Sequence, residues 1–301
     1  MTQTSANVLG RAHSRTKYFG LFSLLAGSIA LWWRPLALTF GLAVSSDAHT
    51  HILLILPLSI TLIYVDIKRS QPSIESRRWM GVIFLSAALL LRALTGWNIW
   101  QLSPGTTLSL SMFALVLCWI GSVIVSLGVQ VFRGLLFPLC FLFLVVPVPE
   151  HALNWIIEFL QHQSAVAAEI LFRVARVPVT RDGVFLSIPD LDIEVARECS
   201  SIRSSTMLIV ITLILAHLFL RSWWRQTILV LLAIPLSIAK NAVRIFSIAE
   251  LGTRVDPGYL NGRLHHSGGI VFLAGALIAI VALLWVLRKG DLRKIPAAAA
   301  H

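Results

Sequence analysis

The chain has 301 residues, of which 57% are hydrophobic and 13% are charged, and its formal net charge is +11. An ordinary soluble domain carries about 25% charged residues, and a water-soluble protein of this length has too little interior for so much apolar surface. The composition therefore excludes a soluble globular protein and predicts an integral membrane protein. Nucleic acid binding would also suit the positive charge, but the Lys and Arg residues form short clusters between apolar runs, as topology signals facing anionic lipid do.

The apolar runs are long enough to cross a hydrocarbon layer of about 30 Å as helices. Only helices and closed barrels satisfy every backbone group in lipid, so we expect an all-α polytopic membrane protein with a bundle of about eight transmembrane helices. The first run is interrupted at Arg34-Pro35, and the fifth is short. The predicted spans are residues 18–44, 51–67, 79–95, 106–127, 132–147, 203–220, 226–247 and 267–287.

The predicted orientation follows from the basic residues, which are enriched in cytoplasmic loops. If the N-terminus is cytoplasmic, the basic clusters near residues 11–17, 68–78, 133, 221–225 and 288–294 all lie inside. The short loop near 96–105 lies outside and has no basic residue. We therefore predict that both termini are cytoplasmic. The chain is expected to form a single membrane domain, residues 1–301, with N-terminal spans in 18–147, an extracytoplasmic segment in 148–202 and C-terminal spans in 203–287.

The extracytoplasmic segment contains two predicted elements. Residues 151–176 read as an amphipathic helix, whose apolar face would lie on the membrane surface or cap the bundle. Residues 177–193 combine turn sequences with short β-prone runs, which predicts a small hairpin or an extended loop.

Cys199 is the first candidate for chemistry. The chain has three cysteines, and an odd count without paired spacing argues against a disulfide framework and a zinc site. Cys199 lies at the predicted start of the sixth span, between Arg197 and Arg203. The positive end of the helix dipole and these cations favour a nucleophilic thiolate, and free N–H groups of the first turn would suit an oxyanion. The alternative is a half-buried structural cysteine.

Arg244 is the second candidate, because it shares one face of the seventh span with Lys240 and Asn241. The three residues lie toward the outer end of that span. Their alternative role is snorkelling, in which long cationic side chains reach the headgroups from a helix end. An Asn and two cations on one face exceed what snorkelling requires.

The adjacent His265 and His266 are the third candidate, at the outer start of the eighth span. A histidine there can titrate near neutral pH and act as a general acid or base. The alternatives are interfacial histidines that only bind headgroups, or a metal site together with His49 and His51. No Asp, Glu or Cys set with ligand spacing accompanies them, so we expect neither a metal nor another cofactor. All three candidates fall at the same predicted membrane boundary.

At these residues the chain resembles the exosortase/archaeosortase family. That family has a Cys followed by small residues, then Asn-x-x-Arg on the next helix, and then His-x-x-x-Gly before the last. The corresponding residues here are Cys199-Ser200-Ser201, Asn241-Ala242-Val243-Arg244 and His265-His266-Ser267-Gly268-Gly269. Ser201 replaces a small residue that is often Gly, and Ile270 replaces a frequent aromatic. The spacing to Gly269 favours His265 over His266.

The resemblance implies a membrane cysteine transpeptidase or protease in a bacterial or archaeal cytoplasmic membrane, with its active site facing outward. Its substrates would be secreted proteins with a C-terminal sorting tail: a short motif such as Pro-Glu-Pro, a transmembrane helix and basic residues. An acceptor amine or glycolipid would complete transpeptidation. The implied catalytic residues are Cys199, Arg244 and His265, and the candidates for substrate binding are Asn241, Arg203 and His266.

Two other functions remain compatible with the sequence. A transporter or export component, for polysaccharide for example, would use Arg244 and the histidines as an ion or substrate path. A non-catalytic scaffold would only recruit tailed substrates. Cys199→Ala discriminates between these hypotheses, because a transporter or scaffold should tolerate the substitution and a thiol enzyme should not.

Overall fold

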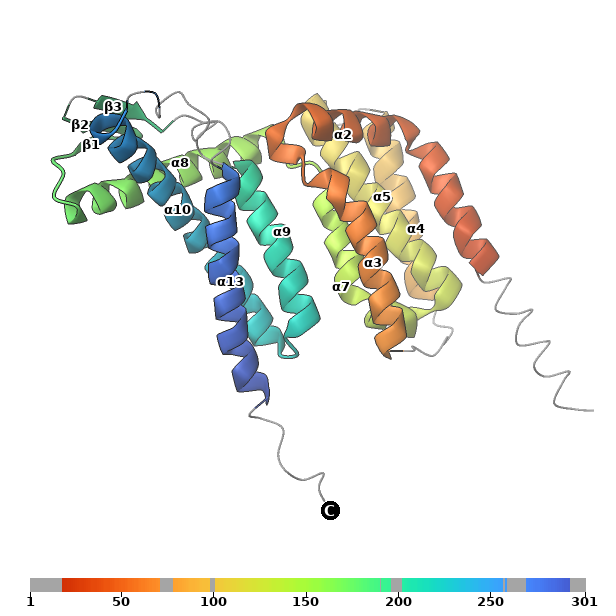
Figure 1. Ribbon diagram of the computed structural model, residues 1–301. Helices are drawn as coiled ribbons and strands as arrows, with labels where there is room; N and C mark the ends of the chain where they lie inside the picture. Colours follow the sequence, from red (N-terminus) through yellow and green to blue (C-terminus); the bar gives the residue numbers. More distant parts are fainter. Residues whose placement is uncertain are drawn as a thin grey trace, which may run out of the picture. The chain divides into compact units, whose positions relative to one another are not determined.

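The chain forms two compact units, residues 1–150 and residues 151–301, and each is described here by itself. The structure is a computed structural model (Figure 1), and it describes residues 18–70, 78–97, 101–189, 191–195, 202–256, 258 and 269–292.

Unit 1 is built from helices only in its described part. A first helix, Tyr18–Leu31, precedes the labelled elements. These are α2 (Trp33–Ser45), η1 (Asp47–His49), α3 (Ile52–Ser70), α4 (Trp79–Gly96), α5 (Pro104–Leu127), α6 (Val129–Gly134), α7 (Leu136–Phe141) and η2 (Leu142–Val145).

The core of unit 1 surrounds α5, which is buried along much of its length. Two glycines bring α4 and α5 together: a Cβ on Gly81 would lie 2.6 Å from Val125 Cγ2, and a Cβ on Gly121 would lie 3.0 Å from the carbonyl oxygen of Gly81. Small residues at such contacts allow membrane helices to approach closely. Trp32 adds a link to α5, because its indole N–H donates to the carbonyl of Ser111 at 2.8 Å.

Two predicted spans are broken in the structure. The interruption predicted at Arg34-Pro35 is confirmed as a 73° bend between Tyr18–Leu31 and α2. The fifth predicted span, 132–147, is divided among α6, α7 and η2. Proline explains both breaks, because it lacks an N–H and clashes with the carbonyl four residues earlier. Pro35 and Pro138 each lie in the first turn of a new helix, where no donor is needed.

Unit 2 combines helices with a small sheet. Its labelled elements are α8 (Glu150–Val174), β1 (Thr180–Asp182), β2 (Phe185–Ile188), β3 (Leu191–Glu194), α9 (Ile202–Phe219), α10 (Trp223–Arg254) and α13 (Gly269–Leu292). The helices α9, α10 and α13 pack around one apolar cluster that includes Leu208, Leu229 and Ile280. Within this unit, α9 and α13 begin and α10 ends on the side where the sheet lies (Figure 1).

The sheet is antiparallel in the order β1-β2-β3. Asp182 pairs with Phe185, so Gly183 and Val184 form the two-residue loop of a tight hairpin. Gly183 adopts a φ of +61°, which glycine tolerates best. The hairpin expected in 177–193 is therefore present, and the structure adds a third strand that the sequence pattern did not indicate.

The fold class predicted from the sequence is confirmed. Among the described residues, six helices are long and apolar enough to cross a membrane, and up to eight spans result if each of two bent pairs forms one span. The amphipathic helix predicted at 151–176 corresponds to α8. The seventh span, predicted as 226–247, is part of a longer helix, because α10 has 32 residues.

Candidate active site

A polar face on α10 forms the centre of the candidate site. Ser237, Lys240 and Asn241 are buried, with Lys240 7% exposed and Asn241 1% exposed, and Arg244 is partly buried on the same helix. Their spacing of three and four residues places them on one side of the helix. Burying a cation and an amide in a membrane helix is costly, which makes such residues functional candidates by default.

This face contacts the first turn of α9. Ser237 Oγ donates to Ser205 Oγ at 2.6 Å, and Lys240 Nζ donates to Ser204 Oγ. Arg203, in the same turn of α9, has interaction partners, as do Asn241 and Arg244. The contacts fix the start of α9 against the middle of α10, and they join two of the segments that carry the candidate motifs.

The two ends of α10 pack against different elements, and the polar face lies between them. Leu229 and Ala233, near its start, pack with α9 and α13. Ala242, Ile245 and Ala249 pack instead with α8 and the sheet. At 1.5 Å per residue, a helix of 32 residues is about 48 Å long, which exceeds the hydrocarbon thickness of about 30 Å. The polar face therefore lies between the apolar helix core and the small structure formed by α8 and the sheet, here called the cap.

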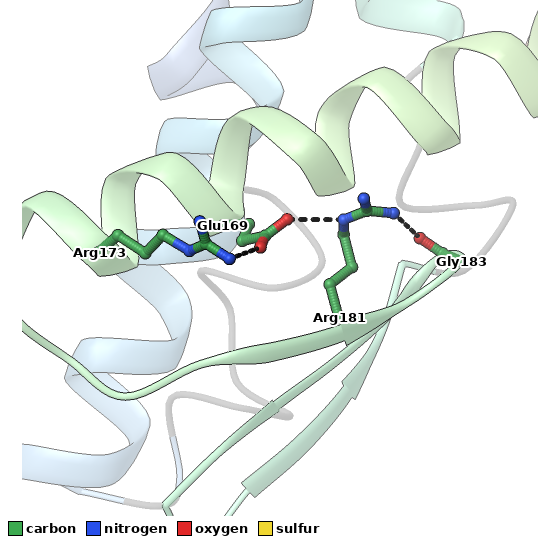
Figure 2. A network of polar contacts seen from close by, with 4 residues as sticks. All are labelled: Glu169, Arg173, Arg181 and Gly183. Atoms are coloured by element: carbon green, nitrogen blue, oxygen red, sulfur yellow. Dashed lines mark hydrogen bonds and ion pairs between the residues drawn. The ribbon is translucent and has the colours of Figure 1, made fainter.

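The cap is held together by a charged network (Figure 2). Arg181 of β1 donates from Nε to Glu169 of α8 at 2.7 Å and from Nη1 to the carbonyl of Gly183 at 3.1 Å. Arg173 binds the other Glu169 oxygen at 2.5 Å. The hydrogen bond from Arg181, with the positive charges of both arginines, holds the pKa of Glu169 below its usual range. The network fixes the first strand to α8.

A second polar contact fixes the end of the sheet. Gln161 of α8 is buried, and its Nε2 donates to the carbonyl of Val195 at 2.8 Å. Val195 directly follows β3 and is fully buried. Residues 196–201 then lead to Ile202, the first residue of α9. Polar contacts therefore hold the described residues on both sides of this six-residue connection, which contains Cys199.

A mostly apolar cavity of about 210 Å³ adjoins the start of α9. Its walls come from α8, α9 and α10, and Ser205, Thr206 and Ser237 supply the hydroxyl groups. Trp155 and Phe159 of α8 line it and stack on each other, with ring centroids 5.9 Å apart. Such a cavity suits an apolar side chain whose backbone hydrogen-bonds to a few polar groups.

The structure brings together part of the set predicted from the sequence. Asn241 and Arg244 share the polar face of α10, and Arg203 lies in the first turn of α9, which contacts that face through Ser204 and Ser205. Cys199, His265 and His266 lie outside the described residues. His49 and His51 are buried in unit 1. Across the described ranges, no group of three or more His, Cys, Asp or Glu residues is placed to hold a metal.

Several contacts were not predicted from the sequence. Ser237 lies three residues before Lys240 and shares its face, so helical spacing alone contained a signal for it. The partners Ser204 and Ser205 lie five and six residues after Cys199, and no pattern in the sequence indicates their contacts with α10. The Gln161 and Glu169 contacts join residues distant in sequence, and no local pattern indicates them.

A comparison with models of protein families shows which family the chain belongs to. A family model described as transmembrane exosortase matches residues 32–285. The chain belongs to the transmembrane exosortase family. Comparison with curated proteins and with solved structures gave no match.

Membership in this family supports a role as a membrane transpeptidase or protease, with secreted proteins that carry sorting tails as its general class of substrate. The match and the apolar helices together identify a multi-pass membrane protein.

Proposed function

We propose that this exosortase is a membrane-embedded cysteine transpeptidase or protease that cleaves the C-terminal sorting tail of secreted proteins through a thioester. Cys199 is the nucleophile, His265 is the general acid and base, and Arg244 stabilises the oxyanion. Asn241, Arg203 and His266 contribute to substrate binding. No metal or other cofactor takes part.

The observation that carries the proposal is the set of polar contacts made by the described residues before and after the Cys199 segment. Gln161 fixes Val195 on one side, and the contacts of Ser237 and Lys240 fix the start of α9 on the other. Cys199 precedes Ile202 by three residues, and Cα atoms three residues apart are separated by at most about 11 Å. This limit supports the proposal that Cys199 acts together with the polar face of α10.

The histidine motif precedes α13, which packs with α9 and α10. His265 precedes Gly269, the first residue of α13, by four residues. Because α13 packs with α9 and α10 and begins on the same side of the unit as α9 (Figure 1), the three motifs lead to one side of this helix group. This arrangement supports a common site for Cys199, Arg244 and His265.

The reaction follows from these groups. The Cys199 thiolate attacks the scissile carbonyl carbon, and the guanidinium of Arg244 donates to the oxyanion that develops. The C–N bond breaks, and protonated His265 gives its proton to the leaving amine. An acceptor amine or water then attacks the thioester, returns a proton to His265 and releases the thiolate.

The apolar cavity beside α9 is the proposed subsite for the substrate next to its scissile bond. Its lining by Trp155, Phe159 and Ile234 favours an aliphatic side chain, and the hydroxyl groups of Ser205 and Thr206 provide bonding partners for an extended peptide. The transmembrane helix of the sorting tail would supply apolar residues close to such a position.

The test is processing of a tailed secreted protein in cells, normalised to the membrane level of each variant. Cys199→Ala should abolish cleavage, whereas Cys118→Ala and Cys140→Ala, at cysteines in apolar segments of unit 1, should retain it. His265→Ala should lose cleavage and His266→Ala should retain most of it. Full processing by Cys199→Ala would end the enzyme proposal and favour a scaffold or a transporter.

We also propose that both termini are cytoplasmic and that the cap faces outward. A tag inserted after Gly183, in the exposed hairpin loop, should then react with an impermeant reagent applied to spheroplasts. A tag that reacts only after the membrane is permeabilised would overturn this orientation and place the cap in the cytoplasm.

A further inference from the structure

A pocket in unit 1 gathers two arginines that the proposed chemistry does not use. It has a volume of about 380 Å³ and lies among the first turns of α2, the end of α4 and the start of α5. Arg34 of α2 and Arg92 of α4 line it, with hydroxyl groups from Thr95, Thr107 and Ser111. No carboxylate is among the described residues that line the pocket.

Arg92 has no charge partner among the described residues. Its guanidinium carbon lies 6.0 Å from the centre of the Trp32 ring, and its Nε is buried with no hydrogen-bond acceptor among the described residues. Among those residues, no carboxylate forms an ion pair with Arg92 or with Arg34. A buried donor without an acceptor is costly, and two cations at one pocket repel each other. An anion in the pocket would relieve both costs.

The start of α5 adds to the positive potential. Pro104, the first residue of this helix, lines the pocket, and the helix is capped by Ser103, which accepts from the N–H of Thr106 at 3.3 Å. A helix N-terminus favours anions, and the planar guanidinium of arginine matches the oxygen pairs of a phosphate. The pocket also lies at the ends of helices long enough to span the membrane, where lipid headgroups are found.

We propose that this pocket binds a phosphate group such as that of an anionic lipid headgroup. Arg34 and Arg92 hold the phosphate oxygens, and the hydroxyl group of Thr107 provides a further donor. Phosphate binding at this pocket does not require the thiol chemistry.

The test measures binding to the purified full-length protein by native mass spectrometry. Phosphatidic acid is the lipid probe, phosphatidylcholine is the zwitterionic control, and inorganic phosphate is the soluble probe. Arg34→Gln and Arg92→Gln should each weaken phosphatidic acid binding about tenfold or more. The matched control is Arg133→Gln, at an exposed arginine of α6 in the same unit, which should bind as the wild type does.

The outcomes separate the sources of the phosphate. Binding of phosphatidic acid alone, lost in the two variants, assigns the pocket to a lipid headgroup. Binding of inorganic phosphate with the same loss assigns it to free phosphate and still supports the recognition chemistry. Equal binding by wild type, Arg34→Gln and Arg133→Gln would overturn the proposal. Arg34 is exposed, so its variant carries the test even if Arg92→Gln fails to fold.

Discussion

The helices α5 and α10 are central to their units, and they differ in the charge of the polar residues that they bury. α5 has 24 residues and no Asp, Glu, Lys or Arg. Its buried polar groups are neutral hydroxyls: Ser122 donates to the carbonyl of Cys118 at 2.7 Å in its own helix, and Ser111 donates to Thr95 of α4 at 3.2 Å. Ser109 bonds to the carbonyl of Pro147 at 2.7 Å. α10 has 32 residues and places Lys240 and Asn241 in buried positions, where Lys240 bonds to a different helix.

This difference distinguishes α5, which supports the fold, from the polar face of α10, which belongs to the candidate site. A neutral hydroxyl group that has a hydrogen-bond partner costs much less in lipid than a buried charge, so its presence indicates little about function. A cation buried between membrane helices is costly and requires a compensating role. On this basis we expect substitutions in α5 to change the amount of folded protein, and substitutions on the polar face of α10 to change the rate of cleavage.

The largest effect is expected at Arg244. Arg244→Ala should lower the rate of tail cleavage about 100- to 1,000-fold, because it removes a donor to the developing oxyanion. The measurement is cleavage of a tailed peptide by purified protein in liposomes. The control is Arg254→Ala on the same helix, where the arginine is mostly exposed and paired with Glu250. Equal activities of the two variants would remove Arg244 from the mechanism.

A smaller loss of activity is expected at Lys240. Lys240→Met keeps much of the side-chain volume but removes the donor to Ser204, and hydrogen bonds of charged groups contribute about 1.5–3 kcal/mol. Cleavage should fall about tenfold or more in the same liposome assay, with the helix content unchanged by circular dichroism. If Lys240→Met cleaves as the wild type does, the contact has no part in positioning α9.

The structural role of α5 is tested by a substitution at Gly81 of α4, which packs against α5. Gly81→Ala places a Cβ 2.6 Å from Val125 Cγ2 and 2.7 Å from the backbone nitrogen of Val125, so α4 and α5 must separate. Such overpacking costs about 1–3 kcal/mol. Gly41→Ala, in α2, is the matched control because its Cβ would meet no atom within 4 Å.

The two glycine variants should differ in thermal stability and not in activity per folded molecule. Gly81→Ala should melt at a lower temperature than Gly41→Ala in the same detergent, and the fraction that remains folded should cleave normally. A large loss of specific activity in Gly81→Ala would show that α4 and α5 do more than support the fold.

The smallest effect concerns the pH dependence of the cap. Because the folded-state pKa of Glu169 is depressed, its ion pairs stabilise the cap above the unfolded-state pKa, and this stability is lost as the pH falls through the folded-state value. Hydrogen-exchange protection of β1, corrected for the intrinsic rate, should therefore decrease from pH 7 to acidic pH.

Glu169→Gln should weaken this protection at pH 7 and remove most of its pH dependence. The control is Glu158→Gln, at an exposed glutamate of the same helix, which should leave both unchanged. Identical exchange in the wild type and Glu169→Gln at every pH would show that the network does not hold β1.

Much of the fold was predictable because the membrane imposes strong rules. Apolar runs identified the helices, and Pro35 identified the bend in the first span, since proline acts through its own backbone. The division of the fifth span and the third strand of the sheet were not predicted. Both depend on how short segments pack, and composition does not encode that packing.

The candidate site was predictable in its residues more than in its contacts. Helical spacing alone put Lys240, Asn241 and Arg244 on one face, which the structure bears out. The partners on α9 and the Gln161 contact with Val195 join segments far apart in sequence, so they required the three-dimensional structure. The roles of all the site residues remain predictions, and Cys199 and His265 lie outside the described part of the chain.

The most direct test of the central claim is to cleave a tailed peptide with the purified protein in the presence of hydroxylamine. A thioester at Cys199 would react with hydroxylamine, so the N-terminal fragment should be released as a hydroxamate that mass spectrometry distinguishes from the carboxylic acid. We predict hydroxamate from the wild type and no cleavage by Cys199→Ala. Release of the acid alone, at an equal rate in the two proteins, would contradict the thiol mechanism.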